Sequence, residues 1–143
     1  KLKCSILILL KKYEEALSLV KKYISKYKDD SYLNLMLGII YVELKQPEKS
    51  LEYLKKVSYP DDEGWEFFST RGMAYFFLVD NQRAITDFKK TIALKPDYAE
   101  VYVLLADCYL ELGEFITACG YFHKALALGL SEAERAIREN CNN

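Results

Sequence analysis

The stretch RGMAYFFLVDNQRAITDFKKTIALKPDYAE (residues 71–100) and the stretch LLADCYLELGEFITACGYFHKALALG (residues 104–129) share one order of small, aromatic and aliphatic residues. A shift of 34 positions aligns the two, and it aligns residues 31–64 with them without any insertion. The clearest columns are Gly38, Gly72 and Ala106; Tyr41, Tyr75 and Tyr109; Leu44, Leu78 and Leu112; Ser50, Ala84 and Ala118; Leu54, Phe88 and Phe122. Recurrence at one fixed period indicates a chain built from stacked copies of a single unit.

Within each period the apolar residues have the spacing of two helices. Tyr102, Leu105, Ala106 and Tyr109 lie at i, i+3, i+4 and i+7, which is one face of a helix. After a break at Gly113, a second stripe runs through Phe115, Ala118, Phe122 and Ala125. The chain has only 6 Gly and 3 Pro, which favours helices over a turn-rich β fold. Each period therefore predicts two antiparallel helices with a short turn, and an all-α fold without a sheet.

The pattern of small, Tyr, Leu, Ala, Phe, Ala and Pro positions in the two quoted stretches resembles the tetratricopeptide repeat. The resemblance covers about nine tenths of the chain, because the period recurs along it. It implies a right-handed superhelix of stacked antiparallel helix pairs. Two positions depart from the family pattern: Arg71 stands where leucine is usual, and Thr91 stands where alanine is usual.

The period also predicts the organisation of the chain as a single domain. Residues 1–30 form a partial repeat, and three full repeats follow at residues 31–64, 65–98 and 99–132. A closing helix is expected over residues 131–141, with Ser131 as its N-cap and Glu134 completing a capping box. Its outward side carries charged residues, as the last helix of a stack of repeats requires.

The resemblance places a concave groove along the first helix of every repeat. The residues expected to line it are Tyr32, Leu35, Met36, Ile39, Val42, Met73, Phe76, Phe77, Val103 and Leu104. Some family members grip a carboxylate with cationic residues in this groove. Here those places hold Leu35, Ile39, Thr70, Glu100 and Leu104. The sequence therefore does not support a receptor for chaperone tails.

An apolar groove indicates a protein–protein interaction scaffold that binds a partner helix or peptide. Two other interpretations of these apolar helices stay open. Inner helices sandwiched between neighbours must be apolar all round without binding anything. Alternatively, the exposed patch of one copy meets another copy, which would make the chain a self-associating structural module and a homo-oligomer.

The segment from Ala106 to Leu126 contains two cysteines and one histidine, which raises the question of a metal or catalytic site. Cys119 and His123 are four residues apart and share a side of a helix. The repeat columns separate them, however, since Cys119 aligns with apolar residues while His123 aligns with Lys89 and Lys55. We therefore expect no metal, no cofactor, no catalytic residue and no enzyme activity.

Cysteine positions allow one covalent link. Cys119 and Cys141 are each 11 residues from Leu130, so they would lie opposite each other across an antiparallel helix pair. A disulfide between them would join the closing helix to the last repeat. Cys108 and Cys119 are likewise symmetric about the turn at Gly113. The alternative is that all four cysteines are free thiols in apolar packing positions.

Charge is distributed unevenly along the chain. The net charge is only −1, but residues 1–28 carry a surplus of +6 and residues 99–143 carry −4. The N-terminal lysines interleave with Tyr13, Tyr23 and Tyr27, which could bind nucleic acid by stacking. More simply, Tyr13 and Tyr23 occupy core columns and the lysines form a solvated face. Nucleic acid is therefore not the expected partner, although an acidic protein fits this face equally well.

No membrane or targeting segment is expected. The longest apolar run near the start, Ile6 to Leu10, has five residues, which is too short to span a membrane, and no cleavage signal follows it. The composition is that of a soluble protein, with the cytoplasm slightly favoured over export.

Overall fold

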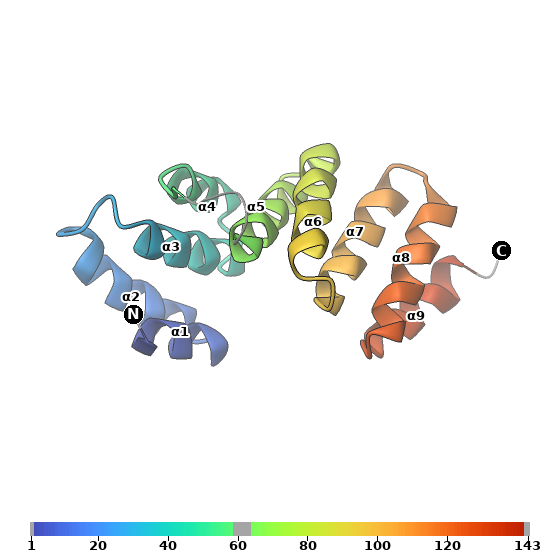
Figure 1. Ribbon diagram of the computed structural model, residues 1–143, viewed down its shortest axis with the longest axis horizontal. Coiled ribbons are helices and arrows are strands. Elements are labelled where there is room, and N and C mark those ends of the chain that lie inside the picture. Colours follow the sequence, from blue (N-terminus) through green and yellow to red (C-terminus); the bar gives the residue numbers. More distant parts are fainter. Residues whose placement is uncertain (1, 59–63, 142–143) are drawn as a thin grey trace. The chain divides into compact units, whose positions relative to one another are not determined.

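The computed structural model describes residues 2–58 and 64–141, and this part of the chain contains nine helices and no strand. Figure 1 shows the helices in chain order. Their bounds are α1 Leu2–Leu9, α2 Tyr13–Ile24, α3 Ser31–Glu43, α4 Pro47–Leu54, α5 Trp65–Phe77, α6 Asn81–Leu94, α7 Ala99–Glu111, α8 Phe115–Ala127 and α9 Glu132–Asn140. The helices α3, α5 and α7 begin 34 residues apart, and so do α4, α6 and α8. The all-α fold predicted from the period is confirmed.

The chain divides into two compact units, residues 1–63 and residues 64–143. In the first unit α1 packs on α2, α2 on α3 and α3 on α4, and α1 also contacts α3. In the second unit each helix from α5 to α9 packs on the next, and α5 also contacts α7. Each unit therefore stacks its helix pairs so that the inner helix of one pair touches that of the next.

Two glycines allow the helices of a pair to approach closely. A Cβ atom at Gly38 would lie 2.6 Å from Leu54 Cδ2, and one at Gly72 would lie 2.7 Å from the Phe88 ring. Both neighbouring side chains are buried, so neither can move aside at low cost. Ser50 stands in the same column as Ala84, and its hydroxyl donates to the Gly38 carbonyl oxygen at 2.8 Å. The small residues of the repeat are therefore sites of close helix packing.

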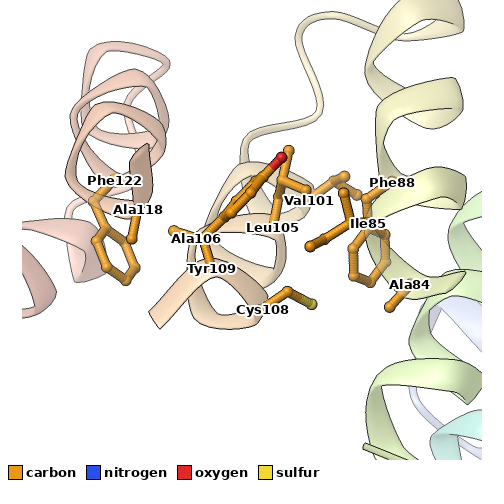
Figure 2. Packing of buried hydrophobic residues seen from close by; sticks show 10 residues of the cluster. All are labelled: Ala84, Ile85, Phe88, Val101, Leu105, Ala106, Cys108, Tyr109, Ala118 and Phe122. Carbon is orange, nitrogen blue, oxygen red and sulfur yellow. The ribbon is translucent and has the colours of Figure 1, made fainter. Parts of the chain in front are cut away.

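The core of the second unit is formed by the buried faces of α6, α7 and α8. Figure 2 shows Ile85 and Phe88 of α6 facing Val101 and Leu105 of α7. The same cluster continues through Ala106, Cys108 and Tyr109 to Ala118 and Phe122 of α8. Ala136, Ile137 and Cys141 at the C-terminal end pack against this cluster. The last helix pair is therefore covered by α9.

The two departures from the family pattern, Arg71 and Thr91, each have a structural partner. Arg71 Nε donates to Asp87 Oδ2 at 2.7 Å, and its Nη2 donates to Asp87 Oδ1 at 2.8 Å. Asp87 stands in the column that holds Tyr53 in one neighbouring repeat. Thr91 is fully buried, and its hydroxyl donates to the Asp87 carbonyl oxygen at 2.9 Å. Where the neighbouring repeats hold Leu and Tyr, this repeat therefore has a bidentate ion pair.

Caps differ between the helices. Asp30 caps α3, since its carboxylate accepts a hydrogen bond from the Leu33 amide at 3.0 Å, and Asp80 caps α6 through the Arg83 amide at 3.1 Å. The expected N-cap at Ser131 is wrong. Ser131 has helical dihedral angles and makes no capping hydrogen bond with its side chain, because the preceding turn already runs into the helix.

The turns between the two helices of a pair share one backbone conformation. Lys11, Lys45, Val79 and Gly113 occupy one column of the repeat, and all four have positive φ, at 56°, 58°, 60° and 76°. Glycine adopts this region freely, whereas a β-branched residue is strained there. Val79 is also 73% exposed, so its side chain gains little from packing. The turn conformation is therefore imposed by the helix pair, against the preference of Val79.

Val79 thus offers a stabilising substitution. We expect Val79→Gly to raise the free energy of unfolding by about 1 kcal/mol, because it removes a left-handed conformation that is costly for valine. Gly113→Val, the reverse change at the equivalent turn, should destabilise the protein. Thermal unfolding followed by circular dichroism measures both. A Val79→Gly variant that melts below the wild type would contradict the strain at this position.

The C-terminal helix is joined covalently to the last pair. The structure links Cys119 of α8 to Cys141 by a disulfide, with the two Cα atoms 5.7 Å apart. Cys108 is a free cysteine and is buried, so the structure does not pair it with Cys119. The bonded residues, Cys119 and Cys141, are the pair that lies equally far from the turn at Leu130.

Candidate functional site

The inner helix α7 has one buried face and one partly exposed face. The buried face holds Val101, Tyr102, Leu105, Ala106, Cys108 and Tyr109. The residues between them are all partly or fully exposed: Glu100, Val103, Leu104, Asp107, Leu110 and Glu111. Three of these are aliphatic, and they recur at helical spacing, so they form a stripe along α7.

The neighbouring inner helix α5 continues this surface. Met73, Phe76 and Phe77 are each partly exposed, and the Phe76 and Phe77 rings lie 5.8 Å apart in an edge-on arrangement. Met73 and Phe76 pack against the same core cluster as Val103 and Leu104 of α7. Because α5 contacts α7 directly, the two stripes are adjacent. We call this surface, with Leu110 and the three carboxylates of α7, the α5–α7 face.

Most of the expected groove residues in the first unit are buried, unlike those of α5 and α7. Leu35, Met36 and Val42 are buried in α3, at 5%, 8% and 1% exposure, whereas Tyr32 and Ile39 are partly exposed. Nine of the thirteen residues of α3 are buried. Leu35, Met36 and Val42 are therefore packing residues and not part of an accessible groove in this structure. The apolar character of α3 is explained by its burial on most sides. This agrees with the interpretation that an inner helix is apolar because its neighbours cover it.

Two further residues of α5 lie at groove positions of the family but are inaccessible. Ser69 and Thr70 are 5% and 4% exposed, and both hydroxyls donate to the Glu66 carbonyl oxygen within the helix. Their polar groups are therefore satisfied locally. The α5 residues of the α5–α7 face, Met73, Phe76 and Phe77, therefore lie in the C-terminal half of the helix.

Every charged side chain on the α5–α7 face is acidic. Glu100, Asp107 and Glu111 lie along α7, and none forms an ion pair with any residue in the described parts of the chain. Burial, and then the charge of Glu111, raise the pKa of Asp107. The fold therefore disfavours the ionised form of Asp107, because no ion pair within the described residues offsets its desolvation.

Three cations of the second unit, Arg71, Arg83 and Lys89, contact residues outside the α5–α7 face. Arg71 pairs with Asp87, and Arg83 pairs with Asp80 while lying 4.4 Å from the centre of the Tyr75 ring. Lys89 lies 5.6 Å from the centre of the Tyr109 ring. Arg71 belongs to α5, and Arg83 and Lys89 belong to α6. None of these three cations forms an ion pair with Glu100, Asp107 or Glu111.

A separate hollow lies in the first unit. Cys4, Leu19, Val20, Tyr23, Tyr27, Asp30 and Leu33 line an open pocket of about 250 Å³. Tyr23 is 54% exposed, so the expectation that it fills the core is wrong. Thr91 and Ala125 stand in the same column and are fully buried, whereas Tyr23 borders the open pocket.

The cysteine and histidine segment does not form a reactive site. His123 is exposed on α8, while Cys119 is disulfide-bonded. Burial raises the pKa of Cys108 to about 12, so this thiol is not a thiolate nucleophile at neutral pH. No group of three metal-ligating side chains was found among the residues that the structure describes. Nor is any helix within residues 2–58 and 64–141 long and apolar enough to cross a membrane.

These features define a helical repeat protein in which antiparallel pairs recur every 34 residues. Tetratricopeptide repeat family models match residues 31–59 and 80–118. The chain belongs to the tetratricopeptide repeat family. It is 34% identical over 61 residues to Tetratricopeptide repeat protein 6 of Homo sapiens, covering 43% of this chain and 12% of that protein. It is 33% identical over 78 residues to the Hsp70-Hsp90 organizing protein of Triticum aestivum, covering 48% and 13%. The matched region is thus a small part of these longer relatives.

Solved structures with a similar fold extend the comparison to most of the chain. MamA is 26% identical with a TM-score of 0.71, over 87% of this chain and 68% of MamA. YrrB, a tetratricopeptide repeat protein with an unusual peptide-binding site, is 20% identical with a TM-score of 0.78, over 94% and 71%. A chain of the Cut9–Hcn1 complex has a TM-score of 0.86 at 17% identity, over 99% of this chain and 29% of that chain.

Proposed function

We propose that this chain is a protein-interaction module that binds a partner helix or peptide on the α5–α7 face. Met73, Phe76, Phe77, Val103 and Leu104 belong to the expected groove and remain partly exposed. This exposure carries the proposal, because aromatic, Met and aliphatic side chains gathered on two adjacent helices suit recognition of an apolar partner segment. The peptide-binding site of YrrB and the membership of the repeat family support the same class of function.

The test separates binding from folding by placing one substitution on and one off the face. Phe77 lies on the α5–α7 face, where it is partly exposed and its ring contacts that of Phe76. Phe115 begins α8 and is 59% exposed, so Phe115→Asp is a matched control in the same unit. A displayed peptide library selected against the wild-type chain supplies ligands, whose affinities are then measured by fluorescence anisotropy.

We expect Phe77→Asp to weaken binding of the selected peptides by at least about tenfold, the loss of an aromatic anchor from an interface centre. Phe115→Asp should bind like the wild type, and both variants should melt within a few degrees of it. Equal binding by Phe77→Asp, or selected peptides that depend on Phe115, would exclude the α5–α7 face. Sizing at several concentrations shows whether a dimer uses the face instead.

A further inference from the structure

We infer that the segment bound by the α5–α7 face is basic as well as apolar, with Lys or Arg residues beside its apolar anchors. This inference rests on the proposed function, and it names the chemical class of the partner. Its basis is the charge of the face, where Glu100, Asp107 and Glu111 accompany the aliphatic stripe of α7. The accessible α5 residues of this face, Met73, Phe76 and Phe77, add no cation.

The three carboxylates share one side of α7. Glu100, Asp107 and Glu111 are separated by seven and four residues, so they repeat at helical spacing along the stripe. Val103, Leu104 and Leu110 lie between them. A bound segment that covers the aliphatic residues therefore comes within reach of carboxylates along its whole length. Such an arrangement favours a ligand whose positive charges flank its apolar side chains.

The negative charge of Asp107 destabilises the folded protein, because this carboxylate is partly buried without an ion pair among the described residues. It is partly buried on the same stripe of α7 as Val103 and Leu110, and no described cation forms an ion pair with it. Its raised pKa has the same cause, which is burial followed by the charge of Glu111. Asparagine in its place would remove this penalty. A ligand cation, on the other hand, would supply the missing partner and be recognised by a group that the fold leaves unpaired.

The charge pattern of the α5–α7 face also excludes the acidic ligands that cationic grooves of other repeat proteins bind. A terminal carboxylate or an acidic segment would meet three like charges, which costs free energy without any compensating donor. The surplus cations of the chain lie in residues 1–28, away from α5 and α7 in sequence and outside the second unit. An acidic ligand would therefore be drawn to that region and not to the α5–α7 face.

The experiment uses two labelled amphipathic peptides with the same Leu and Ala stripe, one with lysines and one with glutamates on the remaining positions. Affinities for the intact chain are measured by fluorescence anisotropy at physiological salt, where distant charges are screened. We expect the lysine peptide to bind about tenfold or more tightly than the glutamate peptide. Chemical shift changes on adding the lysine peptide should concentrate on α5 and α7.

Two matched triple variants test whether the carboxylates of α7 are the groups that attract the lysine peptide. The variant Glu100→Gln/Asp107→Asn/Glu111→Gln should lose about tenfold in affinity for the lysine peptide, while Phe77→Asp should abolish its binding. The control Glu132→Gln/Glu134→Gln/Glu139→Gln makes the same change in net charge on α9, outside the face, and should bind like the wild type. Asp107→Asn alone should weaken binding and raise the melting temperature, a combination that a purely structural role would not give.

The outcomes separate the two proposals. If both peptides bind equally well and both need Phe77, the α5–α7 face is a docking surface but its carboxylates do not select the ligand. If neither peptide binds, or if binding is indifferent to Phe77→Asp, the docking function falls as well. If the α9 control loses as much affinity as the α7 variant, the effect is one of net charge. A dimer broken by Phe77→Asp, with no peptide bound, would make a second copy the occupant and overturn the inference.

Discussion

Replacing Phe122 with Ala is expected to lower the free energy of unfolding of the second unit by about 4 kcal/mol. Phe122 is fully buried between α7 and α8, in the column that holds Phe88 one repeat earlier. Its removal deletes a ring from a close-packed core and leaves a cavity that the neighbouring helices cannot fill, for which losses of about 3–5 kcal/mol are typical. A loss of this size is a large share of the stability of most domains.

The control for this prediction lies in the same helix. Phe115 begins α8 and is 59% exposed, so Phe115→Ala should change the free energy of unfolding by less than about 0.5 kcal/mol. Urea unfolding followed by far-ultraviolet circular dichroism measures both variants. Similar losses in the two would mean that Phe122 does not occupy a packed core position.

The second large effect is expected from breaking the ion pair between α5 and α6. The Asp87 side chain is 3% exposed and the Arg71 side chain is 32% exposed. Asp87→Ala removes the bidentate partner of a guanidinium that also lies 4.8 Å from the centre of the Phe67 ring. Breaking a buried pair typically costs about 3–5 kcal/mol, but water reaches part of Arg71, so we expect a loss of about 2–3 kcal/mol.

Arg71→Leu should cost more than Asp87→Ala, because it strands a carboxylate that is almost fully buried. The double variant Arg71→Leu/Asp87→Tyr should recover most of the loss. It restores the pair found one repeat later, where Leu105 stands in the column of Arg71 and Tyr121 stacks on Tyr109 at 5.6 Å between ring centres. Double-mutant analysis by urea unfolding gives the coupling. Losses that simply add would show that the two side chains do not act as a pair.

How far the sequence determined this structure is clearest at the repeat columns. The 34-residue period placed the helix pairs because every copy needs the same residue types to bury its inner face. Symmetry about a turn offered two cysteine pairs, Cys119 with Cys141 and Cys108 with Cys119, and left four free thiols as the alternative, whereas the structure joins Cys119 to Cys141. Periodicity describes the sequence along the chain. It predicts tertiary contacts only because the geometry of the antiparallel helix pair is the same in every repeat.

Exceptions to the repeat required the tertiary structure. Arg71 is unusual in its column and Asp87 in another, but only the packing of α5 on α6 shows that they compensate each other. The strained turn at Val79 is similar, because its positive φ is imposed by the helices on either side. In both cases the local structure depends on a contact between two helices, and the residue type at one position does not reveal that contact.

For the candidate site, the sequence alone determined which columns form the inner helices and that they lack a cationic clamp. Only the tertiary structure decided which of those residues are accessible: Leu35, Met36 and Val42 are buried, whereas Met73, Phe76, Phe77, Val103 and Leu104 remain partly exposed. It also showed that the carboxylates of α7 form no ion pair within the residues that the structure describes. The physical reason is that accessibility and desolvation depend on everything packed around a side chain, and a repeat column records only what that side chain is.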